Sequence, residues 1–101
     1  PVLGELVIAA KGLGAWYGMA PLPGDPKYGI DPGPIVLQRC QVSSQPKLED
    51  GLLVTSQIDN FGVRQAESAY KNLEKLAYVT RTWGDGYGYL LVATGRAEVM
   101  V

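Results

Sequence analysis

Strand signals dominate the first part of the chain. Residues 1–17 mix apolar side chains with three glycines, which predicts two short strands joined by a glycine turn. Residues 18–34 contain five prolines, each without a backbone donor, and are predicted to be a loop or linker. Residues 35–42 begin with aliphatic residues and are predicted to be a strand. We therefore expect a first unit at residues 1–34 and a second domain at residues 35–101.

In the second part, short apolar runs alternate with amphipathic stretches. Residues 52–55 are apolar and β-prone, as is usual for a strand buried on both faces. Apolar positions recur every three to five residues from 61 to 77, with charged residues between them, which predicts one amphipathic helix. Residues 78–83 are β-branched and aromatic and predict another strand.

A second, more buried helix is predicted for residues 86–94, ending at Gly95, where a left-handed cap costs little. Asp85 stands where an N-cap would, and Tyr87 and Tyr89 are expected in the core. Residues 99–101 would begin the next strand. This alternation predicts a layered α/β (α+β) arrangement.

Composition excludes several classes of partner. The 101 residues are 47% hydrophobic, enough for a globular core, and nine basic against ten acidic residues give a net charge of −1. We therefore expect no nucleic-acid partner and no membrane partner, since no basic surface and no apolar stretch of roughly 20 residues is present. The single Cys40 and the absence of a signal-type N-terminal segment predict a cytoplasmic protein.

The two ends of the chain suggest a fragment of a longer protein. Pro1 stands in place of an initiator Met, and the sequence stops in an apolar run at residues 98–101. A processed N-terminus with a docked C-terminal strand is the alternative explanation.

Few residues offer catalytic chemistry. The chain has no His, which removes the commonest general base and metal ligand. Without a His, Cys40 is expected to be an inert buried thiol. The acidic residues are scattered, with only Glu49 and Asp50 adjacent, so no complete magnesium site is predicted. Residues 11–14 contain glycines but lack the spacing of a phosphate loop, which favours a hairpin turn.

The segment Gly84-Asp85-Gly86 is the strongest candidate for binding. It places free amides and a carboxylate together at the predicted start of a helix. Asp is also a preferred N-cap regardless of function, and on local physics alone plain capping is the favoured interpretation.

A family resemblance adds to this pattern. The run Arg81-Thr82-Trp83-Gly84-Asp85-Gly86-Tyr87-Gly88-Tyr89, continuing through Leu90 to Glu98, resembles the histidinol-phosphate phosphatase branch of the inositol monophosphatase superfamily. Residues 1–16 resemble the strand pair that ends the N-terminal catalytic domain of that superfamily. Residues 19–34 depart from it, because they are longer and richer in proline than the usual short turn.

The resemblance implies a sugar-phosphatase (inositol monophosphatase-like) fold. Residues 1–34 would be the end of the catalytic domain with its loop, and residues 35–101 a truncated C-terminal α/β domain. The activity implied is Mg²⁺-dependent hydrolysis of L-histidinol phosphate, a small-molecule phosphomonoester, to L-histidinol in histidine biosynthesis. A homodimer is implied for the full-length enzyme. Gly84, Asp85 and Gly86 match the segment that contacts the alcohol portion of the substrate.

The metal-binding parts of the family pattern have no counterpart here. Its Glu motif, its Asp-Pro-(Ile/Leu)-Asp-Gly-Thr motif and a later Trp-Asp pair are missing from the sequence. The resemblance therefore implies that Mg²⁺ is bound by residues outside this chain and that the chain alone is inactive.

Two other functions stay open from the sequence. One is an inositol or sugar monophosphatase of the same superfamily, and the other is a non-catalytic binding module. Asp85 favours histidinol phosphate, because a carboxylate suits a cationic amino alcohol better than a neutral polyol. An upstream Asp-Gly-Thr motif and a downstream Trp-Asp pair would distinguish an enzyme from a module.

Overall fold

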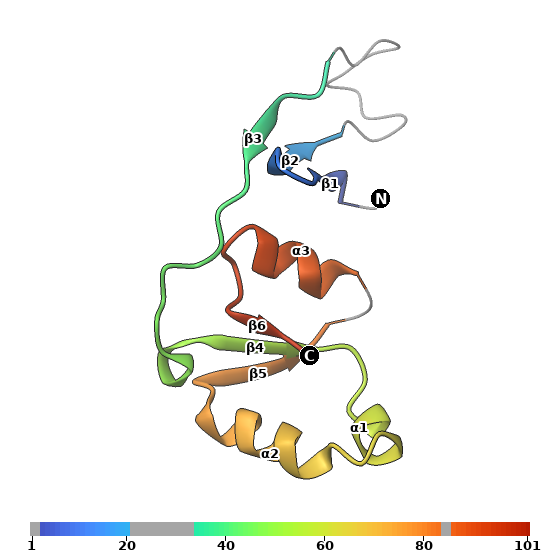
Figure 1. Cartoon of the computed structure of the whole chain (residues 1–101), viewed down its shortest axis with the longest axis vertical. Coiled ribbons are helices and arrows are strands. Elements are labelled where there is room, and N and C mark those ends of the chain that lie inside the picture. Colours follow the sequence, from blue (N-terminus) through green and yellow to red (C-terminus); the bar gives the residue numbers. More distant parts are fainter. Residues whose placement is uncertain (1–2, 21–33, 84–85) are drawn as a thin grey trace. The chain divides into compact units, whose positions relative to one another are not determined.

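The computed structural model describes residues 3–20, 34–83 and 86–101. These residues form a small mixed α/β protein with two three-stranded sheets and three α-helices (Figure 1). The chain divides into two compact units, Pro1–Cys40 and Gln41–Val101. None of the helices in the described ranges is long and apolar enough to cross a membrane.

The first unit is an antiparallel sheet. Its strands are β1 (Glu5–Ala10), β2 (Gly14–Met19) and β3 (Leu37–Arg39), in the order β1-β2-β3. Between β1 and β2, Leu13 N donates a hydrogen bond to Ala10 O at 3.0 Å, and Gly12 and Gly14 have φ of 81° and 85°. Because side chains with a Cβ rarely adopt such angles, the glycines permit the turn. The predicted hairpin with a glycine turn is confirmed.

The third strand is shorter than expected and belongs to the first unit. We expected a strand over residues 35–42 that opens the second domain, whereas β3 spans three residues and pairs with β2. Cys40 N then donates to Ala15 O at 2.8 Å, which ties the end of β3 to the hairpin. The units consequently divide after Cys40, six residues later than the boundary expected after Pro34.

The second unit is built on a parallel sheet with its most buried strand in the middle. Its strands are β4 (Leu52–Thr55), β5 (Val79–Thr82) and β6 (Val99–Met100), in the order β5-β4-β6, and a short 3₁₀ helix, η1 (Leu48–Asp50), precedes β4. Leu53, Val54 and Thr55 are each 0% exposed. Successive side chains of a strand point to opposite faces, so both faces of β4 are covered, as predicted.

Helices cover the two faces of this sheet. The chain steps from β4 to one side to form β5, then crosses back to the other side of β4 to form β6. Right-handed crossovers in opposite directions place their helices on opposite faces. Figure 1 shows α3 (Tyr87–Ala93) and α2 (Glu67–Leu76) on the two sides of the strands. The core under α3 consists of Val54, Leu91 and Ala97, with Leu52, Tyr87, Val92 and Met100 packed against it.

The prediction of one helix from residue 61 to 77 is confirmed over residues 67–76 and was wrong before them, because the helix is interrupted at residues 64–66. Two helices are present, α1 (Asp59–Val63) and α2. Gln65 has φ of 55°, and its N–H donates to Gly62 O, while Ala66 N donates to Phe61 O. This is a Schellman motif, which ends α1 and redirects the chain. Hydrophobic periodicity continues across the break, with Phe61 stacked on Tyr70 at 4.6 Å between ring centroids, so the sequence pattern hides it.

The prediction of a helix over residues 86–94 is confirmed, since α3 covers all but its ends. Gly95 has φ of 72°, and the bonds from Gly95 N to Val92 O and from Arg96 N to Leu91 O form a second Schellman motif. Tyr89, however, is 64% exposed, so its expected place in the core was wrong. Residues two apart face different directions on a helix, and Leu91 takes the inward side.

Candidate functional site

The carboxyl edge of the parallel sheet is the candidate site. Because β4, β5 and β6 run in the same direction, the edge gathers their last residues, Thr55, Thr82 and Met100. In open α/β sheets, ligands bind outside the carboxyl ends of the strands. Residues 83–86, which connect β5 to α3, lie in sequence directly after this edge.

Of the predicted site residues, Gly86 lies in the described part of the chain. It holds the N-cap position of α3 with φ of −66° and ψ of −15°, and Leu90 N donates to its carbonyl oxygen at 3.3 Å. No side-chain hydrogen bond caps this helix among the described residues. A Cβ built on Gly86 would meet no atom within 4 Å, so the position is open. Gly84 and Asp85 lie outside the described residues, and so does the capping role expected of Asp85.

Trp83 directly precedes the predicted binding segment, and Tyr87 directly follows it. Its backbone N–H donates to Thr55 O at 2.8 Å, which extends the pairing of β5 with β4 by one residue. Its ring stacks on Tyr87 with centroids 5.6 Å apart and planes inclined by 27°. Trp83 is nevertheless 48% exposed. An anchored backbone therefore carries a large aromatic ring that is open to solvent at the candidate edge.

Arg96 adds a cation to this aromatic pair. Its guanidinium carbon lies 5.9 Å from the centroid of the Tyr87 ring, within the range of a cation–π interaction. Arg96 Nε donates to Thr94 Oγ1 at 2.9 Å, and that hydroxyl donates to Leu90 O at 2.8 Å. The stack of Trp83 on Tyr87 was not predicted from the sequence. The signal for it is the pair of aromatic residues four positions apart across the turn from β5 to α3.

Glu98 has a structural role at the amino end of the parallel sheet. Its carboxylate accepts a hydrogen bond from Leu52 N, while Glu98 N donates to Leu52 O at 3.1 Å. The bond from Leu52, followed by one from Ser43, lowers the pKa of Glu98 below its ordinary value. Glu98, the residue before β6, thus holds the start of the central strand β4 through both its backbone and its side chain.

The carboxylates of α2 are engaged with neighbouring side chains. They line a hollow of about 350 Å³ formed by Ile58, Asp59, Gly62, Glu67, Tyr70, Lys71 and Glu74. Lys71 Nζ lies 2.6 Å from Glu67, and this contact lowers the pKa of Glu67 and raises that of Lys71. The Tyr70 hydroxyl donates to Glu74 at 3.3 Å, and burial, followed by the charge of Glu74, raises the pKa of Tyr70.

Magnesium does not fit the described part of this chain. Within residues 3–20, 34–83 and 86–101, no three Asp, Glu, Cys or His side chains are grouped so that they could hold a metal ion. A divalent cation of this kind needs several oxygen ligands at one point.

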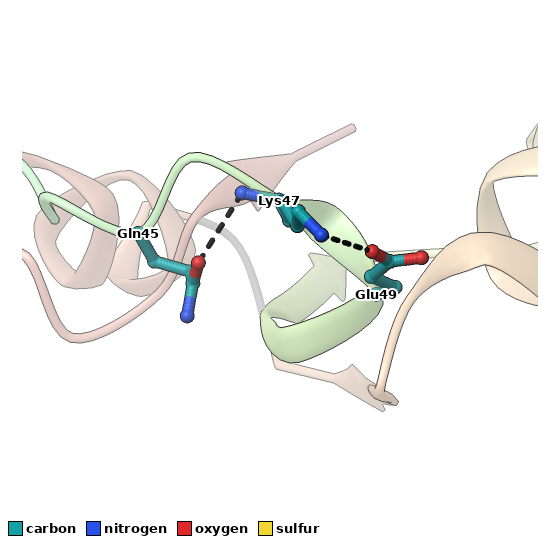
Figure 2. Close-up of polar contacts among 3 residues, drawn as sticks. All are labelled: Gln45, Lys47 and Glu49. Atoms are coloured by element: carbon teal, nitrogen blue, oxygen red, sulfur yellow. Dashed lines mark hydrogen bonds and ion pairs between the residues drawn. The ribbon is translucent and has the colours of Figure 1, made fainter.

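An apolar hollow and an exposed ion pair are two further features of the described residues. An apolar hollow of about 460 Å³ in the first unit is lined by Ile8, Ala9, Ala10, Leu13, Trp16 and Leu37. Figure 2 shows the polar contacts at the start of η1, where Lys47 N donates to Gln45 Oε1 at 3.3 Å and Lys47 Nζ lies 3.1 Å from Glu49. The Lys47 and Glu49 side chains are 65% and 64% exposed, so this ion pair contributes little to stability.

Comparisons with known proteins leave the family of the chain open. No protein-family model matches the sequence, and no curated protein matches it at a significant level.

Proposed function

We propose that this chain is part of a Mg²⁺-dependent phosphomonoesterase of the inositol monophosphatase superfamily, in its histidinol-phosphate phosphatase branch. In this proposal Gly84, Asp85 and Gly86 form the wall of the substrate pocket around the alcohol portion. The observation that carries the proposal is the position of the family-like run at residues 81–98. It begins in β5 and passes the carboxyl edge of a parallel sheet, where such sheets bind ligands.

The finer fold is part of the same proposal. The alternation of parallel strands with helices in the second unit is consistent with the C-terminal domain of a sugar-phosphatase fold. The antiparallel sheet of the first unit is consistent with the strands that end the catalytic domain. Topology of this kind also occurs in unrelated proteins, so the resemblance of residues 81–98 supplies the link to a function.

The metal ligands are assigned to residues outside this chain. The described residues lack a suitable group of carboxylates. The chain's own contribution is therefore to bind and orient the alcohol portion of a small phosphomonoester. The purified 101-residue chain should consequently show no phosphatase activity, and activity should return when the metal-binding half is supplied. The complete enzyme is proposed to be cytoplasmic and homodimeric.

The choice of histidinol phosphate as the substrate in this proposal depends on Asp85. A partly desolvated carboxylate pairs more strongly with an ammonium or imidazolium group than with a neutral hydroxyl. Histidinol phosphate carries such cations in its alcohol portion, whereas inositol phosphate carries hydroxyl groups. Asp85 should therefore select histidinol phosphate through its charge.

The test is the substitution Asp85→Asn in the complete enzyme, assayed with L-histidinol phosphate and with inositol phosphate. Asn retains much of the capping ability of Asp and removes its charge. We expect kcat/KM for histidinol phosphate to fall relative to inositol phosphate by roughly thirtyfold, about 2 kcal/mol. Asp59→Asn, at the start of α1, is the matched control and should leave the ratio unchanged. If kcat/KM falls equally for both substrates, or if only the melting temperature falls, Asp85 is a structural cap and does not select the substrate.

A further inference from the structure

Trp83 combines a fixed position with an exposed ring. Its backbone is held to the last residue of β4 by the hydrogen bond to Thr55 O, and its ring is held on one side by Tyr87. Burial of an indole ring is strongly favourable, yet this residue remains 48% exposed. An exposed tryptophan whose orientation is already fixed loses little conformational entropy when a ligand stacks on it.

The contacts of Tyr87 fix the orientation of the stack. Tyr87 belongs to α3 and packs against the core formed by Val54, Leu91 and Ala97. Arg96 lies over the Tyr87 ring at 5.9 Å, so the Tyr87 ring already accepts one planar cation. The face of an indole ring carries negative electrostatic potential, and it attracts cations more strongly than a phenol ring does.

We propose that Trp83 is a specificity-determining residue whose exposed ring stacks on a planar, cationic ring in the alcohol portion of the substrate. The inference rests on the proposed function, because that function places the alcohol portion beside residues 84–86. It adds a chemical requirement that a carboxylate alone does not impose. A carboxylate accepts any cation, whereas a stacking surface favours a flat one such as a protonated imidazole.

The experiment uses the complete enzyme with Trp83→Leu and Trp83→Phe, assayed with L-histidinol phosphate and inositol phosphate. Leu keeps an apolar side chain and removes the ring, whereas Phe keeps a ring. We expect Trp83→Leu to lower kcat/KM for histidinol phosphate about tenfold and that for inositol phosphate less than about twofold. Trp83→Phe should recover most of this loss. Trp16→Phe, in the first unit, is the control and should change neither value.

A second measurement covers the case in which Trp83→Leu does not fold. Replacing tryptophan throughout the enzyme with fluorinated tryptophans weakens the potential of the ring face and nearly keeps its shape. The kcat/KM for histidinol phosphate should then fall stepwise with the number of fluorine atoms, while that for inositol phosphate stays constant.

The outcomes separate this inference from the function on which it rests. If the unmodified enzyme hydrolyses neither phosphomonoester, the proposed function fails and the inference fails with it. If the enzyme hydrolyses histidinol phosphate but loss of the ring affects both substrates equally, or neither, the function stands and Trp83 is a packing residue. A stepwise fluorine effect on histidinol phosphate alone supports the inference.

Discussion

Replacing Glu98 with Gln tests how the parallel sheet of the second unit is joined at its amino end. In the native chain, Glu98 and Leu52 exchange two hydrogen bonds, one through the backbone of Glu98 and one through its carboxylate. Glu98→Gln keeps an oxygen that can accept the bond from Leu52 N and removes the negative charge. The substitution therefore measures what the charge adds to the bond.

The expected loss of stability follows from the strength of such bonds. A hydrogen bond to a charged group contributes roughly 1.5–3 kcal/mol, compared with about 1 kcal/mol for a neutral one. Glu98 is half-buried, and solvent screening reduces the benefit of its charge. We expect Glu98→Gln to lower the free energy of unfolding by about 1 kcal/mol at pH 7. Glu98→Ala, which leaves Leu52 N without this acceptor, should lower it by about 2 kcal/mol.

The effect of the charge should depend on pH. The hydrogen bonds from Leu52 and Ser43 lower the pKa of Glu98 in the folded chain below its ordinary value of 4.5. A group whose folded pKa is depressed stabilises the fold above its unfolded pKa and loses that contribution as pH falls through the folded pKa. The difference between the native chain and Glu98→Gln should thus be complete above about pH 5 and should vanish in stronger acid.

Urea unfolding followed by circular dichroism, at a series of pH values from 7 to 3, measures both effects. Glu67 also has a lowered pKa, but it is present in both proteins, so the difference between them isolates Glu98. Glu49→Gln is the control, since that side chain is 64% exposed and its loss should cost under about 0.5 kcal/mol. A stability difference that stays the same from pH 7 to pH 3 would refute the role assigned to the charge.

Four further substitutions test the backbone and the core. Gln65→Gly should stabilise the chain by about 0.5–1 kcal/mol in urea unfolding, because Gln65 has φ of 55°, and a loss of stability would contradict the break between α1 and α2. Gly95→Ala should lower the free energy of unfolding by about 2–3 kcal/mol, since the added Cβ would lie 2.9 Å from Gln41 O. Gly12 also has a positive φ but has open space around it, so Gly12→Ala should lower the free energy of unfolding by about 1 kcal/mol. Equal losses for the two substitutions would argue against the contact with Gln41. Thr55 Oγ1 is buried and has no hydrogen-bond partner among the described residues. Thr55→Val should therefore leave the free energy of unfolding unchanged or raise it by up to about 1 kcal/mol. A clear loss of stability in urea unfolding would show that the hydroxyl is hydrogen-bonded.

The strands were predictable because each is marked by local composition. The β-branched and apolar residues of β4 and β5, and the glycines of the β1–β2 turn, carry their signal within a few positions. The extent of β3 was not predictable in the same way. Its length depends on how far β2 continues beside it, and this pairing joins residues about twenty positions apart.

The break between α1 and α2 escaped the sequence pattern for a different reason. The left-handed residue of a Schellman motif is usually a glycine, as Gly95 is at the end of α3. Here the left-handed residue is Gln65, which gives no compositional signal. The stack of Trp83 on Tyr87 was missed because it depends on the angle between a strand and the following helix, which local patterns do not specify. The position of the predicted binding segment after a predicted strand was accessible from the sequence alone.

The family-like run and the carboxyl edge of the parallel sheet meet in the same short stretch of chain. The resemblance rests on residue types at residues 81–98 and makes no use of strand direction. The carboxyl edge is defined by the parallel pairing of β4 with β5 and β6, independently of residue types. Trp83 satisfies both, because it lies inside the run and its backbone is bonded to the last residue of the central strand. The proposed function therefore predicts that a change of side chain around Trp83 alters ligand selection with little effect on the sheet itself.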